Sequence, residues 1–130
     1  MKMGRPLNAP NIYSSPEYFG LSIVDVLDDP LASYAFEMLV VWSDQDGTLY
    51  YGCDNGCSCP SPFEEFEGIH DLTPITDDTW DEFAKDVTEL AEQGDMRHLS
   101  DGAKCEYQAF QVEKTRLLAK VALLLRENHK

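Results

Sequence analysis

One stretch of the sequence decides the fold: Tyr34-Ala-Phe-Glu-Met-Leu-Val-Val-Trp-Ser43, then Asp44-Gln-Asp-Gly47, then Thr48-Leu-Tyr-Tyr-Gly52. Large apolar residues occupy every second position of the first segment, which predicts a β-strand. Aspartate and glycine are turn residues, and the third segment is rich in strand-forming residues, so the whole stretch predicts a β-hairpin. We expect its more apolar face to lie on the core, and this face carries Tyr34, Phe36, Met38, Val40 and Trp42.

The chain before the hairpin divides into an irregular arm and a further strand. Residues 1–16 contain three prolines and no sustained hydrophobic period, so we expect an N-terminal arm that precedes a single domain over residues 17–130. From Tyr18 onward apolar residues alternate with others and predict a strand. We expect this strand to end just before Pro30, because proline lacks the N–H that the ladder requires.

A long loop and two helices are predicted after the hairpin. The loop runs from Cys53 to Ile69 and is rich in glycine, proline and cysteine. Apolar residues then recur at helical spacing, with Thr79 and Glu82 as a candidate capping box and Gly94 as a candidate C-terminal cap. The last helix is predicted to run from about residue 101 to about residue 127.

These elements predict an α+β fold. An antiparallel sheet of three or more strands, formed by residues 18–54 with its hairpin at about 34–52, packs against two C-terminal α-helices that cover its apolar face. The predicted core residues are all large and apolar: Tyr34, Phe36, Met38, Val40, Trp42, Trp80, Phe83, Val87, Leu90, Leu117, Val121 and Leu124.

Composition excludes several classes of protein. The chain has 130 residues, of which 43% are hydrophobic, so it is large and apolar enough for one folded domain. Its formal net charge is −14, and residues 17–95 carry twenty acids but one base. This balance argues against direct binding to nucleic acid or to anionic lipid. The sequence contains no apolar run as long as a membrane span and no signal peptide, so we expect a cytoplasmic protein.

The segment from Val40 to Leu49 resembles the first motif of haloacid-dehalogenase-type phosphatases, an apolar strand followed by DxDGT. The resemblance implies that Asp44 is a nucleophile and Asp46 a general acid beside Mg²⁺. Those enzymes need a parallel sheet with further strands. The roughly 80 residues that follow do not supply the missing βα units, each of which takes about 30 residues. We therefore interpret the motif as a tight turn and expect no enzymatic activity, with a metal-dependent phosphatase as an alternative.

The cysteines raise the question of a metal. Cys53, Cys57 and Cys59 lie within seven residues, and His70 follows eleven residues later. Their C-x₃-C-x-C spacing differs from the C-x₂-C knuckle of zinc sites. A structural zinc, a labile disulfide between Cys53 and either neighbour, and free thiols are the three possibilities. We expect free thiols and no bound metal or cofactor, because the cytosol is reducing. Cys105 is expected to lie in the core.

The first predicted helix carries a strongly acidic face as well as its apolar one. This face is formed by Asp78, Asp81, Glu82, Asp86 and Glu89. Like charges four residues apart destabilise a helix by a few tenths of a kcal/mol per pair. The face either keeps the protein soluble or mimics DNA phosphates and occupies the groove of a DNA-binding protein.

Three segments carry a resemblance to a known family: Pro16-Glu-Tyr-Phe-Gly-Leu21, Val40-Val-Trp42 and Tyr50-Tyr-Gly-Cys-Asp-Asn-Gly-Cys-Ser-Cys-Pro-Ser-Pro-Phe-Glu64. They are similar to an uncharacterised family of small acidic proteins from actinobacteriophage genomes, most specifically in the run Gly-Cys-Ser-Cys-Pro-Ser-Pro-Phe-Glu. The resemblance covers about residues 16–70. It implies a phage gene expressed in the cytoplasm of a bacterial host cell and does not imply a mechanism.

The expected function is therefore that of a non-enzymatic phage accessory protein that binds a host or phage protein. The candidate contact surface is the loop at 53–66, where Phe63 and Phe66 are exposed aromatic anchors flanked by Glu64 and Glu65. In the alternative, both phenylalanines fold back onto the domain. The alternative function is a DNA mimic that inhibits a DNA-binding host protein through the acidic face.

Overall fold

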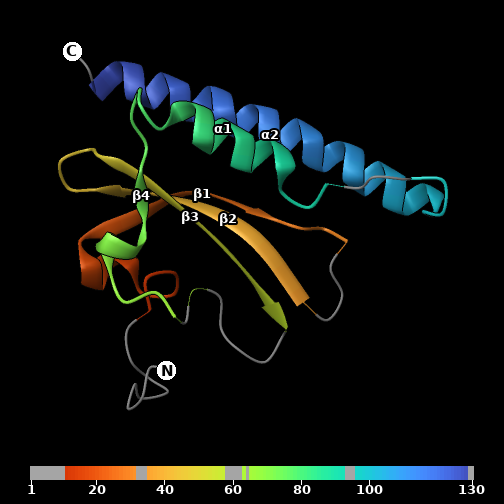
Figure 1. Ribbon diagram of the computed structural model, residues 1–130, viewed down its shortest axis with the longest axis horizontal. Coiled ribbons are helices and arrows are strands. Elements are labelled where there is room, and N and C mark those ends of the chain that lie inside the picture. Colours follow the sequence, from red (N-terminus) through yellow and green to blue (C-terminus); the bar gives the residue numbers. More distant parts are fainter. Residues whose placement is uncertain (1–10, 32–34, 58–62, 64, 93–95, 129–130) are drawn as a thin grey trace.

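The computed structural model describes residues 11–31, 35–57, 63, 65–92 and 96–128. It confirms the α+β class, with a four-stranded sheet and two α-helices (Figure 1). The elements follow one another as η1 (Pro16–Phe19), β1 (Leu21–Asp28), β2 (Ala35–Asp44), β3 (Leu49–Cys57), η2 (Ile69–Asp71), β4 (Thr73–Pro74), α1 (Trp80–Glu89) and α2 (Asp101–Asn128).

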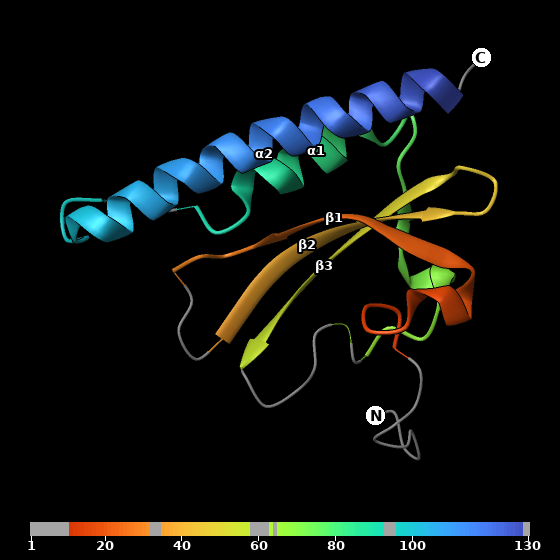
Figure 2. The same cartoon turned by 180° about the vertical axis from the view of Figure 1, so that it is seen from behind.

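The sheet is antiparallel throughout, in the order β1-β2-β3-β4, and the predicted hairpin is confirmed as β2 and β3 (Figure 2). β3 runs to Cys57, five residues beyond the predicted Gly52, so the loop starts later than predicted. The reason is pairing: β2 is ten residues long, and its first residue, Ala35, pairs with Cys57. The start of the first strand was predicted too early, because Tyr18 lies in the 3₁₀ turn η1.

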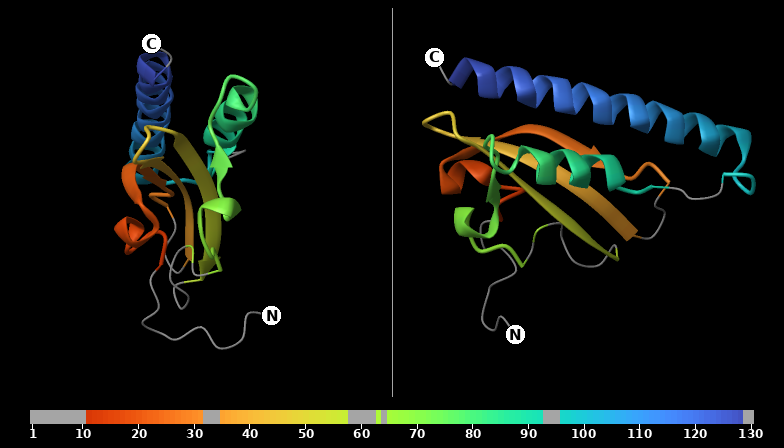
Figure 3. Two further views of the ribbon diagram at one scale, coloured as in Figure 1. Left: turned by 90° about the vertical axis from the view of Figure 1, so that its left-hand side faces the viewer. Right: turned by 45° about the horizontal axis from the view of Figure 1, so that its top comes forward.

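Both helices cover one face of the sheet, and this is the face opposite to the one predicted (Figure 3). Leu39 and Val41 of β2 point toward the helices and are completely buried there. Phe83 and Val87 of α1, and Leu117 of α2, pack on them. Of the predicted core residues in the helices, Phe83, Val87, Leu90, Leu117 and Val121 are buried, whereas Trp80 and Leu124 are partly buried.

The face predicted to lie under the helices has its own, separate core. Met38, Val40 and Trp42 are buried there against Ile12, Phe63, Leu21 and Leu72. The Trp42 indole Nε1 donates a hydrogen bond of 2.9 Å to the Ile12 carbonyl. Residues 11–16, predicted to be part of an arm, therefore belong to the domain. Tyr34 and the side chain of Phe36 lie outside the described residues.

The ends of α1 differ from the predicted caps. Thr79 precedes the helix, but its hydroxyl donates to the Pro74 carbonyl at 2.7 Å, so the capping box with Glu82 does not form. The helix ends at Glu89, well before Gly94, which lies outside the described residues. Ala91 follows in a left-handed conformation with φ 52°. In residues 11–128, gaps excepted, no helix is long and apolar enough to cross a membrane.

Burial on both faces of β2 predicts that an aspartate is equally damaging at neighbouring positions. Val40→Asp and Val41→Asp should each lower the free energy of unfolding by more than about 4 kcal/mol, because each buries a carboxylate without a partner. Urea denaturation followed by circular dichroism measures this. Val112→Asp is the matched control, because Val112 is 51% exposed. A cooperatively folded Val40→Asp variant would contradict burial of the second face.

Candidate functional site

The DxDGT segment forms the tight turn predicted for it. Asp44 Oδ1 accepts hydrogen bonds of 2.9 Å from the backbone N–H groups of both Asp46 and Thr48, and Oδ2 accepts one from the Tyr50 hydroxyl at 3.2 Å. The Gly47 N–H donates to the Asp44 carbonyl, and Gly47 adopts φ 87°. Both carboxylate oxygens thus hold the hairpin together, and β3 returns antiparallel instead of leading into a helix. This geometry gives the phosphatase alternative no support.

Phe63, the first predicted anchor, is completely buried. Its ring packs edge-on against Trp42 at a centroid distance of 5.2 Å and against Phe66 at 4.8 Å. Its backbone has φ 62°, and its N–H donates to Asp54 Oδ2 at 2.6 Å, which holds this left-handed conformation. Gly52 leaves room for the neighbouring side chains of this core, since a Cβ atom there would lie 3.0 Å from Leu72 Cδ2 and 3.3 Å from Phe66 Cε2.

The prediction that Phe63 is an exposed anchor is therefore wrong, and the alternative that it folds back onto the domain is confirmed. Phe66 is partly buried in the same core. Of the two flanking acids, Glu65 is exposed and Glu64 lies outside the described residues. The part of this loop that the structure describes therefore covers the core on the face of the sheet opposite the helices.

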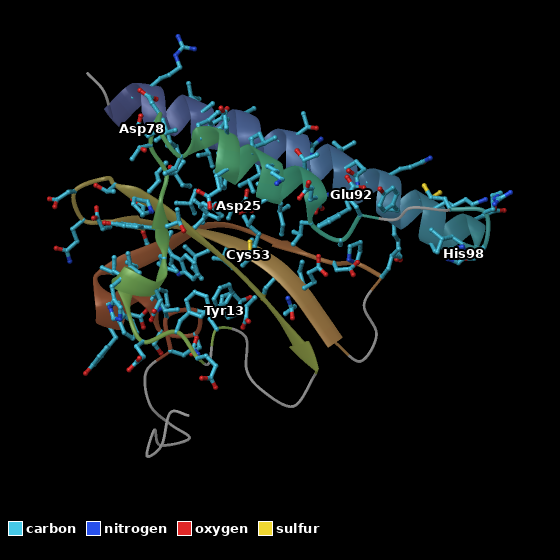
Figure 4. The ribbon with its side chains drawn as sticks, in the orientation of Figure 1. Tyr13, Asp25, Cys53, Asp78, Glu92 and His98 are labelled. Atoms are coloured by element: carbon cyan, nitrogen blue, oxygen red, sulfur yellow. The ribbon has the colours of Figure 1, made fainter. Side chains whose placement is uncertain are left out.

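The acidic face predicted for α1 is present and faces solvent. Its exposed carboxylates are Asp78, Asp81, Glu82 and Glu89, with Asp77 just before them. Across the described ranges, no lysine or arginine forms an ion pair with any of these five. Figure 4 shows Asp78 and Glu92 near opposite ends of α1, with Cys53 on β3 beneath the helix.

Asp86, the remaining member of that face, is turned toward the sheet. The hydroxyl of the buried Tyr51 donates a hydrogen bond of 2.7 Å to Asp86 Oδ2, and burial together with this bond raises the pKa of Tyr51. Cys53 follows on the same face of β3. Burial by surrounding atoms, and then the charges of Asp86 and Glu37, raise the pKa of its thiol to about 12 although its side chain still contacts solvent. Carboxylates thus gather where α1 overlies β3.

A second polar group closes the C-terminal end of α1. Lys114 of α2 is 3% exposed, and its Nζ donates to the Thr88 carbonyl at 2.9 Å and lies 3.8 Å from Glu92 Oε1. Burial lowers the pKa of Lys114. Glu37 Oε2 of β2 accepts a hydrogen bond of 2.6 Å from the Ala91 N–H. Lys114 and Glu37 thus bond to backbone groups at the C-terminal end of α1 and stabilise its ending at Glu89.

A shallow apolar depression of about 500 Å³ lies between the start of α1 and the end of α2. It is lined by Trp80, Ala122 and Leu125, with Asp77 and Arg126 also contributing. Asp77 lines the depression and Asp78 follows it in the chain, so the depression adjoins the acidic face of α1.

The cysteines do not assemble a site in the part of the chain that is described. Cys53 and Cys57 are four residues apart in one strand, so their Cα atoms are about 13 Å apart and too distant for a disulfide. Cys59 lies outside the described residues, and Cys105 is exposed, contrary to prediction. Among those residues no group of three or more His, Cys, Asp or Glu side chains is placed to hold a metal ion.

Comparison with known proteins identifies the family but not an activity. Residues 10–116 match a domain family of unknown function, DUF7574. The chain belongs to this family. The DUF7574 match includes the sheet, α1 and the first part of α2. No curated protein and no solved structure matches the chain.

The hydrogen bonds of the turn predict unequal roles for its two aspartates. Asp44→Ala should lower the free energy of unfolding by about 1–3 kcal/mol, because two backbone N–H groups lose their acceptor. Asp46→Ala should change it by less than about 0.5 kcal/mol. Urea denaturation measures both. Hydrolysis of an aryl phosphate with Mg²⁺ that is lost in Asp44→Asn would contradict the structural role.

The raised pKa of Cys53 predicts that its thiol reacts slowly with alkylating reagents. With a pKa of about 12, about one thiol in 10⁴ is ionised at pH 8, and the thiolate is the nucleophile. Iodoacetamide should therefore modify Cys53 at least about 100-fold more slowly in the folded protein than in urea, as followed by mass spectrometry. Asp86→Asn should speed the folded-state reaction because it removes one of the two neighbouring charges. Equal rates in folded and unfolded protein would contradict this pKa.

Proposed function

We propose that the protein acts without catalysis, by binding a positively charged surface of another protein through the acidic outer face of α1. The observation that carries the proposal is the set of exposed carboxylates without a cationic partner in the described residues: Asp77, Asp78, Asp81, Glu82 and Glu89. This surface replaces the predicted aromatic anchors Phe63 and Phe66, because Phe63 is buried and Phe66 is partly buried.

Electrostatics supports this choice. Asp77 and Asp78 lie in the turn before α1, and Asp81, Glu82 and Glu89 lie on the helix, so these exposed like charges repel one another. A basic partner offsets this repulsion on binding. Opposite charges on the two proteins also accelerate their encounter and disfavour partners of the wrong sign.

The depression beside Trp80 adds an apolar anchor to the acidic face. Interfaces derive much of their affinity from a few aromatic or arginine side chains in well-packed pockets, with charged groups at the rim. Trp80, Ala122 and Leu125 supply such a pocket, and Asp77 lies at its edge. A partner with an apolar side chain next to lysine or arginine fits this combination.

The proposed setting is the cytoplasm of a bacterial cell, where the protein serves as a phage accessory protein and the partner is a host or phage protein. If the basic surface of the partner is its DNA-binding groove, the protein is a DNA-mimic inhibitor. The exposed carboxylates of α1 support this narrower form, because they present negative charge where DNA presents phosphate. Competition by duplex DNA for the captured partner separates the two forms.

The proposal predicts that neutralising α1 abolishes partner binding. Asp78→Asn/Asp81→Asn/Glu89→Gln should reduce partner recovery from bacterial lysate at least about tenfold, because it removes three of the carboxylates that contact the partner. The matched control is Glu17→Gln/Glu106→Gln/Glu127→Gln, which removes the same charge from other exposed positions. Quantitative mass spectrometry after capture measures recovery. Equal recovery by the two variants would contradict a role for α1.

A further inference from the structure

β3 has a backbone edge that β4 covers over two residues only. β4 consists of Thr73 and Pro74, which pair with Tyr51 and Tyr50. β3 continues past this pairing to Cys57, and Figure 1 shows it extending away from β4. The remaining part, Gly52–Cys57, is a strand edge without a neighbouring strand in the described part of the chain.

The register shows which backbone groups this edge presents. The Asp44 N–H donates to the Thr48 carbonyl, so the even-numbered residues of β3 bond toward β2. Odd-numbered residues face the other way, as the bond from the Ile75 N–H to the Leu49 carbonyl confirms. Cys53 and Asn55 therefore direct their N–H and C=O groups out of the sheet. Within the described ranges these groups have no hydrogen-bond partner.

The opposite edge of the sheet is protected. β1 carries an irregularity between Ile23 and Asp25. The Lys120 ammonium donates to the Val24 carbonyl at 3.1 Å, and Asp25 Oδ1 accepts from the Val26 N–H at 2.8 Å. Bulges, lysines and side chains that satisfy edge groups are the devices by which proteins prevent strand addition. They are present at β1, whereas the outward groups of Cys53 and Asn55 lack such partners among the residues that the structure describes.

Acidic side chains overlie the open edge. In the end-on view of Figure 3, α2 lies above β1 and α1 lies above β3. The Tyr51–Asp86 hydrogen bond fixes α1 in this position. Asp86 and Glu37 are close enough to Cys53 to raise the pKa of its thiol, and Glu82 acts on Tyr51 in the same way. Any side chain that an added strand directs toward α1 meets these carboxylates.

We propose that the edge Gly52–Cys57 binds an extended segment of a partner protein by β-strand addition, and that this segment carries lysine or arginine at alternate positions. Side chains of a strand alternate between its two faces, so every second residue of the segment lies beneath α1. The edge is six residues long, at about 3.3 Å each, and accommodates a segment of about that length. This inference rests on the proposed function, since it names the basic element that the acidic face receives.

The probe is a fluorescein-labelled peptide of eight residues in which lysine and valine alternate. Fluorescence anisotropy should show saturable binding to the full-length protein, and no binding of the matched peptide in which glutamate replaces lysine. Methylating alternate backbone nitrogens of the probe, in either register, keeps its charge but removes donors. At least one of the two methylated peptides should bind about tenfold more weakly, because one of them loses the N–H groups that face β3.

The protein variants make the complementary test. Cys53→Pro/Asn55→Pro removes two outward N–H groups, and proline is tolerated at such edge positions. It should weaken probe binding at least about tenfold, whereas Cys53→Ala/Asn55→Ala, which keeps both N–H groups, should not. Thermal melting verifies folding. If the proline variant does not fold, the methylated probes on wild-type protein decide the question.

The outcomes separate this inference from the proposed function. Absence of probe binding to the wild type, or equal binding by proline and alanine variants and by all probes, overturns strand addition. If Asp78→Asn/Asp81→Asn/Glu89→Gln still loses its protein partner in that case, the proposed function of the acidic face is supported although strand addition is not. Sedimentation experiments give a further outcome. If the wild-type protein is a dimer and the proline variant is a monomer, the edge binds a second copy of the chain, and the proposal of a basic partner segment is overturned.

Discussion

Neither face of β2 is polar along its central residues. Met38, Val40 and Trp42 are buried on one side and Leu39 and Val41 on the other, with exposed fractions of 0–3%. A strand of this kind is stable only when both faces are covered, since each large apolar side chain contributes roughly 1.5–3 kcal/mol on burial. The rest of the chain is arranged to provide the two covers. The helices form one, and residues 12–21 together with residues 63 and 65–72 form the other.

This constraint also explains where polar groups occur. Each cover is anchored to the sheet by hydrogen bonds as well as by apolar contact. Tyr51–Asp86 and Glu37–Ala91 attach α1, and Trp42–Ile12 and Asp54–Phe63 attach the opposite cover. The carboxylates near Cys53 serve this attachment, and they also make the region between α1 and β3 strongly negative. Some acidic residues of this region thus bond to the sheet or to the helix end, whereas others face solvent.

The sequence was sufficient for features that depend on local pattern. The hairpin, the Asp44 turn and both helices follow from alternation, turn residues and helical spacing, which act over a few residues. The sequence did not reveal which face of β2 lies under the helices, because both faces are apolar and alternation does not specify the cover. The extension of β3 to Cys57 was missed because Gly52 and Gly56 are poor strand formers that pairing with β2 overrides.

For the candidate site, the acidic face of α1 was predicted because charge spacing is visible in the sequence. The burial of Phe63 was one of two alternatives, and a left-handed phenylalanine held by Asp54 has no sequence pattern of its own. The open edge of β3 depends on the shortness of β4 and on the direction of backbone groups. Both are properties of the assembled sheet, so a single sequence without a structure does not reveal them.

The two covers have a consequence for folding during synthesis. Trp42 bonds to a residue 30 positions earlier, and Val24 of β1 bonds to a lysine 96 positions later. Contacts over such sequence distances form slowly, because a long loop must close before they stabilise the chain. The hairpin leaves the ribosome well before α2, so the face that carries Leu39 and Val41 is not fully covered until α2 has also emerged. Premature termination before α2 therefore yields a sheet whose helix-facing side is covered by α1 alone, and the apolar surface left exposed is a substrate for chaperones or for aggregation.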